Sequence, residues 1–155
     1  MLASPRQVLQ WVRPTWADRY EIFAPDLGVP RAVLTLDAPG RATLQTRQAT
    51  YLIGQPSRLA PVWVADADGA PIAQAQTSWW GHRHLQFQDG RVLRFRPSSL
   101  LQNRWLWSSD TGIPRAIVRQ NQIFFSPDRP VREGFGTLLA GLSIYFLRTR
   151  PTLFF

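Results

Sequence analysis

Short runs of alternating apolar and polar residues recur along most of this chain, separated by turn residues. The clearest run spans residues 84–95 and reads His-Leu-Gln-Phe-Gln-Asp-Gly-Arg-Val-Leu-Arg-Phe. Successive side chains of a strand point to opposite faces, so Leu85 and Phe87 share one face of the first half. Leu93 and Phe95 likewise share one face of the second half. Asp-Gly between two such runs predicts a β-hairpin.

The loop length of this hairpin follows from the apolar pattern. A two-residue loop would place Leu85 opposite Arg94, whereas a three-residue loop would place Leu85 opposite Leu93. Only the second arrangement keeps apolar side chains together on the buried face. We therefore predict a three-residue loop with Gly90 in a left-handed conformation at a bulge.

The same unit of strand, Asp/Gly turn and returning strand recurs at 62–75 and at 104–118. Further strand-like runs lie at 20–23, 31–36, 42–46, 51–53 and 122–125. Strands roughly every 8–12 residues with turns between them are typical of a sandwich or a barrel. The 155 residues fit one domain. We predict a single β domain over residues 1–155, with strands from about residue 18 to about residue 126.

The character of the chain changes near its end. No charged residue occurs between Glu133 and Arg148, a stretch of 14 residues. An acid at the start and arginines at the end suit the dipole of a helix, and Pro151 cannot continue one. We predict a helix over about 132–148.

This helix is apolar on every side, so it must be buried all round or lie in lipid. A membrane-spanning helix needs about 20 apolar residues, and at about 1.5 Å per residue this run reaches only about 21 Å. The favoured interpretation is a buried core helix. Two alternatives stay open: a membrane anchor extended by residues 152–155, and a helix that packs on a partner protein.

The composition excludes several kinds of catalytic and binding site. The chain has no Cys, and its 18 basic residues are all Arg, which gives a net charge of +8. Absence of Cys excludes disulfides and thiolate chemistry, and absence of Lys excludes Schiff bases and the P-loop. The first twelve residues lack the apolar run of a secretory signal. We expect a cytoplasmic protein.

The candidate binding residues are arginines concentrated in one part of the sequence: Arg83, Arg91, Arg94, Arg96 and Arg104. Only one acid, Asp89, lies among them. Arg94 and Arg96 alternate with Leu93 and Phe95, which places them on the solvent face of a strand. Guanidinium groups on a β surface suit phosphate binding. The alternative is a solvated strand face in an arginine-rich chain.

Other candidate chemistry is weaker. His82 and His84 would point the same way on a strand, but no third His exists to complete a metal site, and turn or surface positions explain both residues. Ser98, Ser99, Ser108 and Ser109 lack a nucleophile-elbow motif. Two aromatic pairs, Trp79-Trp80 and Trp105 with Trp107, could stack bases or anchor at a membrane, although a core position is favoured for both.

A run of strands followed by one apolar helix resembles the tubby-like superfamily, which includes LURP-one-related proteins and phospholipid scramblases. The resemblance rests on the opening strand 20–23, the recurring Asp-Gly hairpins and the segment 134–147, and it covers about residues 16–148. It implies a closed antiparallel barrel of about twelve strands around a central helix. The chain lacks the family's Cys-rich stretch, acidic calcium-binding cluster and phosphoinositide-binding Lys, so no binding residue is transferred.

These observations lead to one functional expectation. We expect a non-enzymatic, bacterial-type tubby-like domain with no cofactor and no metal, which binds an anionic phospholipid or another phosphate-bearing ligand. It could then lie peripherally at a membrane. Nucleic acid is the less favoured partner. The alternative functions are a structural or protein-interaction domain and a small protein anchored through its C-terminal helix.

Overall fold

The computed structural model describes residues 7–14, 18–25, 28–57, 60–78, 82–99, 103–129 and 131–149. Within them lie twelve strands and one helix: β1 (Val8–Val12), β2 (Arg19–Phe23), β3 (Ala32–Ala38), β4 (Arg41–Thr46), β5 (Thr50–Gly54), β6 (Val62–Asp66), β7 (Pro71–Thr77), β8 (Arg83–Phe87), β9 (Val92–Ser99), β10 (Arg104–Ser109), β11 (Pro114–Arg119), β12 (Gln122–Phe125) and α1 (Glu133–Thr149).

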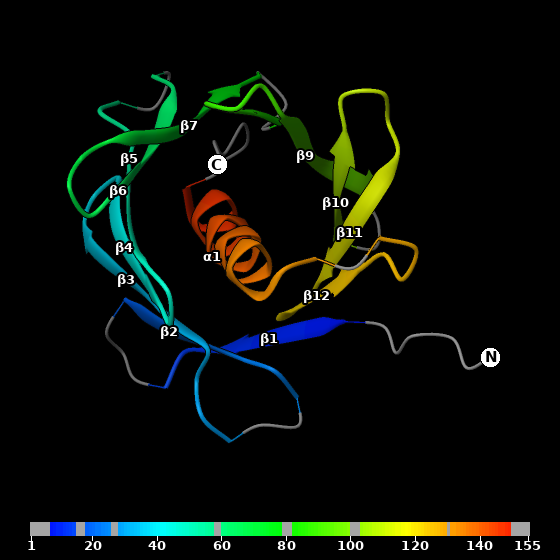
Figure 1. Cartoon of the computed structure of the whole chain (residues 1–155), viewed down its shortest axis with the longest axis horizontal. Helices are drawn as coiled ribbons and strands as arrows, with labels where there is room; N and C mark the ends of the chain where they lie inside the picture. Colours follow the sequence, from blue (N-terminus) through cyan, green and yellow to red (C-terminus); the bar gives the residue numbers. More distant parts are fainter. Residues whose placement is uncertain are drawn as a thin grey trace.

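The strands form a closed barrel of simple topology. Each strand pairs antiparallel with its neighbour in the chain, and β1 pairs with β12 to close the ring. Figure 1 shows the ring of strands with α1 inside it. The predicted fold class, a closed antiparallel barrel around a C-terminal helix, is confirmed.

The first strand is the main error of the sequence prediction, which began the strands at about residue 18. β1 lies ten residues earlier and pairs Val8 with Phe124 and Leu9 with Ile123. Its five residues are too few to establish a period by themselves. They form a strand because the edges of β2 and β12, which would otherwise be unpaired, supply hydrogen-bond partners on both sides.

Three hairpins share the predicted turn. In the β8–β9 turn, Leu85 lies opposite Leu93 and Gly90 has a φ of 93°, as predicted. Gly69 and Gly112 occupy the equivalent left-handed positions in the β6–β7 and β10–β11 turns. These conformations favour Gly, which has no Cβ to clash with the backbone.

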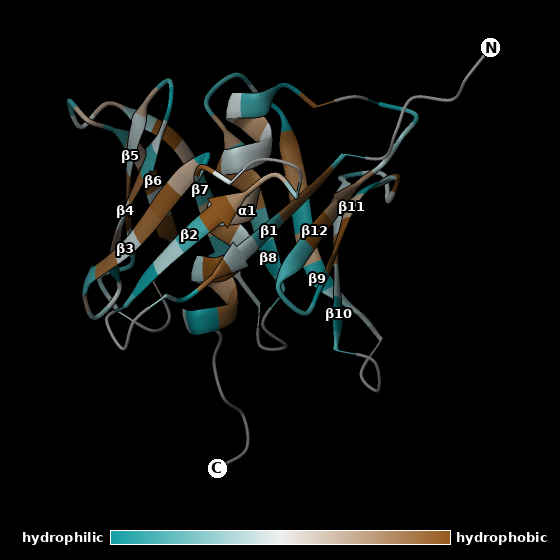
Figure 2. Ribbon diagram, turned by 90° about the horizontal axis from the view of Figure 1, so that it is seen from below, coloured by the Kyte–Doolittle hydropathy of each residue, from teal (hydrophilic) through white to brown (hydrophobic). Residues whose placement is uncertain are grey.

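Helix α1 is the core of the molecule. Every residue from Gly136 to Phe146 is buried, and Figure 2 shows the apolar helix enclosed by the inner faces of the strands. The predicted range, 132–148, differs from the observed one by a single residue at each end. The expectation of a buried core helix is confirmed, and the side chains from Gly136 to Phe146 face protein on all sides. Nowhere in the described ranges is a helix both long and apolar enough to span a membrane.

The helix lies close to one wall of the barrel. Small inward-facing side chains lie on β3 and β4 of this wall: Ala32 and Ala42. A Cβ at Gly141 of α1 would lie only 2.7 Å from a methyl carbon of Leu44 on β4. Across the barrel, Phe95 stacks on Trp105 at a centroid distance of 4.9 Å and contacts Trp107 at 4.7 Å. Small residues on one wall and aromatic residues on the other therefore fill the space around an off-centre helix.

Polar groups of the helix are satisfied inside the barrel. The indole Nε1 of Trp107 donates to Ser143 Oγ at 2.8 Å, and the Tyr145 hydroxyl donates to the carbonyl of Gly40 at 2.8 Å. Burial raises the pKa of Tyr145 to about 12. Each contact joins α1 to a different part of the barrel and so fixes the rotation of the helix within it.

Candidate functional site

The structure separates the five candidate arginines, which the sequence had grouped together. Arg83 lies inside the barrel, Arg91 lies in the β8–β9 turn, and Arg104 begins β10. Only Arg94 and Arg96 share one exposed strand surface.

Arg83 is a structural residue and is the clearest correction to the predicted cluster. Its side chain is 1% exposed and faces inward with Leu85 and Phe87. The guanidinium donates to Thr77 Oγ1 at 2.7 Å and to the carbonyl of Thr149 at 3.3 Å, near the last turn of α1. Burial lowers its pKa. Arg83 therefore satisfies the end of the helix, and it also lines part of the groove described below.

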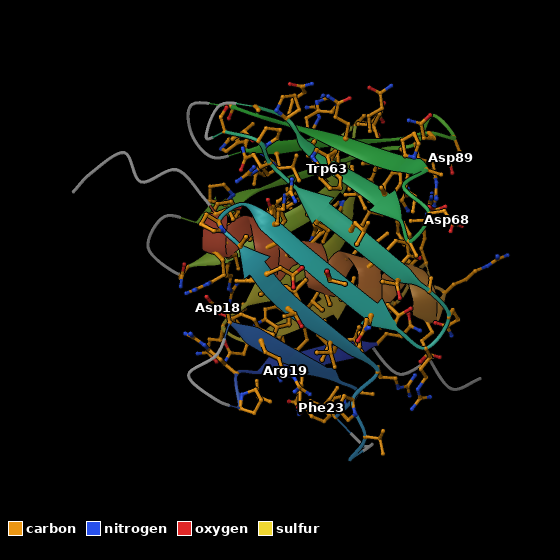
Figure 3. The ribbon with its side chains drawn as sticks, turned by 90° about the vertical axis from the view of Figure 1, so that its left-hand side faces the viewer. Asp18, Arg19, Phe23, Trp63, Asp68 and Asp89 are labelled. Atoms are coloured by element: carbon orange, nitrogen blue, oxygen red, sulfur yellow. The ribbon has the colours of Figure 1, made fainter. Side chains whose placement is uncertain are left out.

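Arg91 is held at the opposite end of the barrel. Its Nε donates to Asp89 Oδ2 at 2.8 Å, and its guanidinium lies over the rings of Phe87 and Phe135 at 5.0 and 4.9 Å. Figure 3 shows Asp89 at the end of the molecule where α1 begins. Arg91 thus cannot act with Arg83 in one site.

Arg94 and Arg96 point outward from β9, as predicted. The register places Arg94 between His84 on β8 and Ser108 on β10. Arg96 lies opposite Leu106 on β10 and close enough to His82 to affect its protonation. Two residues of a strand advance about 7 Å, so both guanidinium groups can reach one ligand.

These side chains border a groove of about 620 Å³ on the outside of β7, β8, β9 and β10. We call it the outer groove and define it by His82, His84, Arg94, Arg96 and Ser108. Its sequence positions are dispersed, and the hairpin β8–β9 and the pairing of β9 with β10 bring them together.

Ser108 supplies a feature that the sequence did not reveal. Its side chain is 1% exposed, and its Oγ has no hydrogen-bond partner among the described residues. A β-bulge between Trp107 and Ser108 shifts the register of β10 against β11 at this point. A buried hydroxyl without a partner is costly, and a ligand oxygen in the groove would remove that cost.

The electrostatics of the outer groove favour an anion. Within the described residues, neither Arg94 nor Arg96 forms an ion pair. Burial, and to a lesser degree the Arg96 charge, lower the pKa of His82, so its imidazole is neutral at pH 7 and offers one N–H donor. One carboxylate, Asp110, also borders the groove.

The remaining candidates have other positions. Trp105 and Trp107 are core residues, 7% and 0% exposed, which confirms the favoured interpretation. Trp79 and Trp80 lie outside the described residues. Arg104 is half-buried beside Arg119 on β11 and does not border the outer groove.

The two histidines border the same groove, and they lack the further ligands of a metal site. Among the described residues, no group of three or more His, Cys, Asp or Glu side chains is placed to hold a metal ion. In comparisons with known proteins, no family model, curated protein or solved structure matches the chain.

Proposed function

We propose that the chain is a non-enzymatic, tubby-like domain that binds a phosphate-bearing anion in the outer groove. The observation that carries this proposal is the pair Arg94 and Arg96, which is exposed and without ion pairs in the described structure, beside the unpartnered hydroxyl of Ser108. The ligand is either a phospholipid headgroup or a soluble phosphate compound. With a headgroup as ligand, the protein is cytoplasmic and peripheral at the membrane.

The donor set matches a phosphate group. Each guanidinium offers planar, paired N–H donors that bind two oxygens at once, and it keeps its charge at any physiological pH. The Ser108 hydroxyl and the neutral His82 ring add uncharged donors at the side of the groove. In the described part of the chain, Ser108 Oγ has no hydrogen bond to a base that could activate it as a nucleophile.

The test compares two double variants of equal charge. Arg94→Gln with Arg96→Gln removes the proposed site, whereas Arg41→Gln with Arg119→Gln removes two exposed arginines elsewhere on the barrel. Pyrophosphate binding is measured by calorimetry, and vesicle binding by co-sedimentation with phosphatidylcholine alone or mixed with phosphatidylserine.

We expect wild-type protein and the control to bind pyrophosphate or the anionic vesicles, and the Arg94/Arg96 variant to lose at least about tenfold in affinity. Binding to pyrophosphate alone identifies a soluble ligand, and binding to anionic vesicles identifies a headgroup. Equal loss in both variants, or no binding to either probe, would refute the proposal. Either result would favour the alternative of a structural or protein-interaction domain whose charge is incidental.

A further inference from the structure

A second cavity lies at the end of the barrel where α1 begins, away from the outer groove. It has a volume of about 560 Å³. Four arginines from three parts of the chain border it: Arg91, Arg115, Arg129 and Arg132. We call these four residues and the cavity they surround the basic mouth.

The inner surface of the basic mouth is apolar. Leu93, Phe125 and Leu139 belong to the hydrophobic core and also line the cavity. Val131 and Phe135 lie half-buried above them, just before and within the first turn of α1. A molecule that enters the mouth therefore meets charge at the rim and the core of the barrel beneath it.

Arg91 is paired with Asp89, but the other three arginines of the rim have no ion pair in the described residues. These three are Arg115, Arg129 and Arg132. The acid of the first helical turn, Glu133, pairs instead with Arg31 at 2.7 Å, and it does not line the cavity. The one acid that does is Asp110.

Their position makes this cluster unfavourable for the folded protein alone. The beginning of a helix carries a partial positive charge, so cations there are destabilising and anions are stabilising. Three arginines without ion pairs around one cavity, Arg115, Arg129 and Arg132, add mutual repulsion. A bound anion would relieve both effects.

The shape of the apolar surface indicates which anion. The guanidinium of Arg91 already covers one face of Phe87 and one face of Phe135, which removes stacking surface for a planar aromatic ligand. The other apolar residues that line the cavity include the aliphatic Leu93, Val131 and Leu139, beside Phe125. Branched aliphatic side chains suit a flexible hydrocarbon chain.

We propose that the basic mouth binds an amphipathic anion, an acyl chain that ends in a negatively charged group. The chain lies against Leu93, Val131 and Leu139, and the charged end lies between Arg129 and Arg132. The ligand is a free fatty acid or an acyl lipid drawn from a membrane. This site shares Asp110 with the border of the outer groove but uses neither Arg94 nor Arg96.

The experiment uses decanoate as the probe and two control ligands. Decanol has the hydrocarbon chain without the charge, and acetate has the charge without the long chain. The full-length protein is titrated by calorimetry. The site variant is Arg129→Gln with Arg132→Gln. The matched control is Arg94→Gln with Arg96→Gln, which removes the same charge from the outer groove.

We expect saturable binding of decanoate to wild-type protein and to the control, and binding at least about tenfold weaker to the site variant. Decanol and acetate should each bind at least about tenfold more weakly than decanoate. The proposal would be refuted if wild-type protein bound decanol as tightly as decanoate. It would also be refuted if the site variant bound decanoate as tightly as wild-type protein. Pyrophosphate binding by the site variant separates the two sites, because neither Arg129 nor Arg132 lines the outer groove.

The two lipid sources are separated with vesicles. If the ligand is a free fatty acid, the site variant should bind phosphatidylserine vesicles as wild-type protein does. If it is a membrane lipid, vesicle binding should fall in the site variant as decanoate binding falls. Retention of full decanoate binding by the site variant refutes both forms of the proposal.

Discussion

Arginines at the two ends of the barrel differ in burial and in their contacts. Where α1 ends, Arg83 is buried and donates to Thr77 and to the carbonyl of Thr149. Where α1 begins, Arg129 and Arg132 are exposed and have no ion pair among the described residues. The chain has one kind of basic residue, so the difference comes from the surroundings.

The helix explains this difference. The last turn of a helix leaves carbonyl oxygens without partners and carries a partial negative charge, so a guanidinium there is both bonded and attracted. The backbone of the first turn presents N–H donors and a partial positive charge, so it neither accepts a hydrogen bond from an arginine nor attracts its charge. Arg83 at the end of α1 therefore contributes to stability, whereas Arg129 and Arg132 at its beginning remain available for a ligand.

Replacing Arg83 should give the largest loss of stability. Arg83→Ala leaves the Thr149 carbonyl without its guanidinium donor, removes the contact with Phe146 and leaves a cavity. We expect a cost of about 3 kcal/mol in urea denaturation. Arg83→Met should cost less, about 1–2 kcal/mol, because its chain fills the space and removes a buried charge. An Arg83→Ala protein within about 0.5 kcal/mol of wild-type would contradict a structural role.

Two glycines of α1 test whether packing loosens towards the basic mouth. A Cβ at Gly141 would overlap Leu44, whereas a Cβ at Gly136, nearer the mouth, would lie 3.5 Å from Phe125 in ordinary contact. Gly141→Ala should therefore destabilise the protein by about 1–2 kcal/mol, after the gain in helix propensity is counted. Gly136→Ala should be neutral or stabilising by up to about 1 kcal/mol. If thermal denaturation showed the same change in stability for both variants, the helix would be packed equally closely at both positions.

The comparison also shows what the sequence could reveal. Alternation in 84–95 predicted the hairpin, its loop and the outward direction of Arg94 and Arg96, because these depend only on local geometry. The same alternation extends to Arg83, which shares a face with Leu85 and Phe87, so its burial could have been inferred. It was missed because a charged residue at the start of a strand is usually exposed.

Other features depend on closure of the barrel and leave no local pattern. The basic mouth combines Arg91 from a turn, Arg115 from β11, and two residues before α1. The bulge beside Ser108, whose hydroxyl has no partner in the described residues, depends on the pairing of three strands. β1 is a strand because β12 and β2 lie beside it. Such features need the pairing of residues far apart in the chain.

Tyr145 provides a pH test of the buried end. Its pKa is raised to about 12, so the folded state holds the phenol proton more tightly than the unfolded state, where the pKa is about 10. The stability due to this difference is present below pH 10 and is lost as the pH rises from about 10 to about 12. Tyr145→Phe should cost about 1 kcal/mol at neutral pH through the lost bond to Gly40.

The variant should also lose the alkaline dependence that Tyr145 causes. Denaturation of both proteins between about pH 9 and pH 11 gives the comparison, and groups that titrate in both cancel. Parallel curves would show that the phenol ionises as easily in the folded barrel as in the unfolded chain.

The smallest expected effect concerns Arg132 of the basic mouth, which has no ion pair in the described residues. Arg132→Gln should change the free energy of unfolding by no more than about 0.5 kcal/mol, and in the stabilising direction at low salt, because it removes a repelling charge beside the start of α1. The gain should vanish in about 1 M salt, where charges are screened over about 3 Å. A clear loss of stability at low salt would mean that Arg132 has a structural partner like that of Arg83. Arg83 and Arg132 would then differ in exposure, but both would stabilise the folded protein.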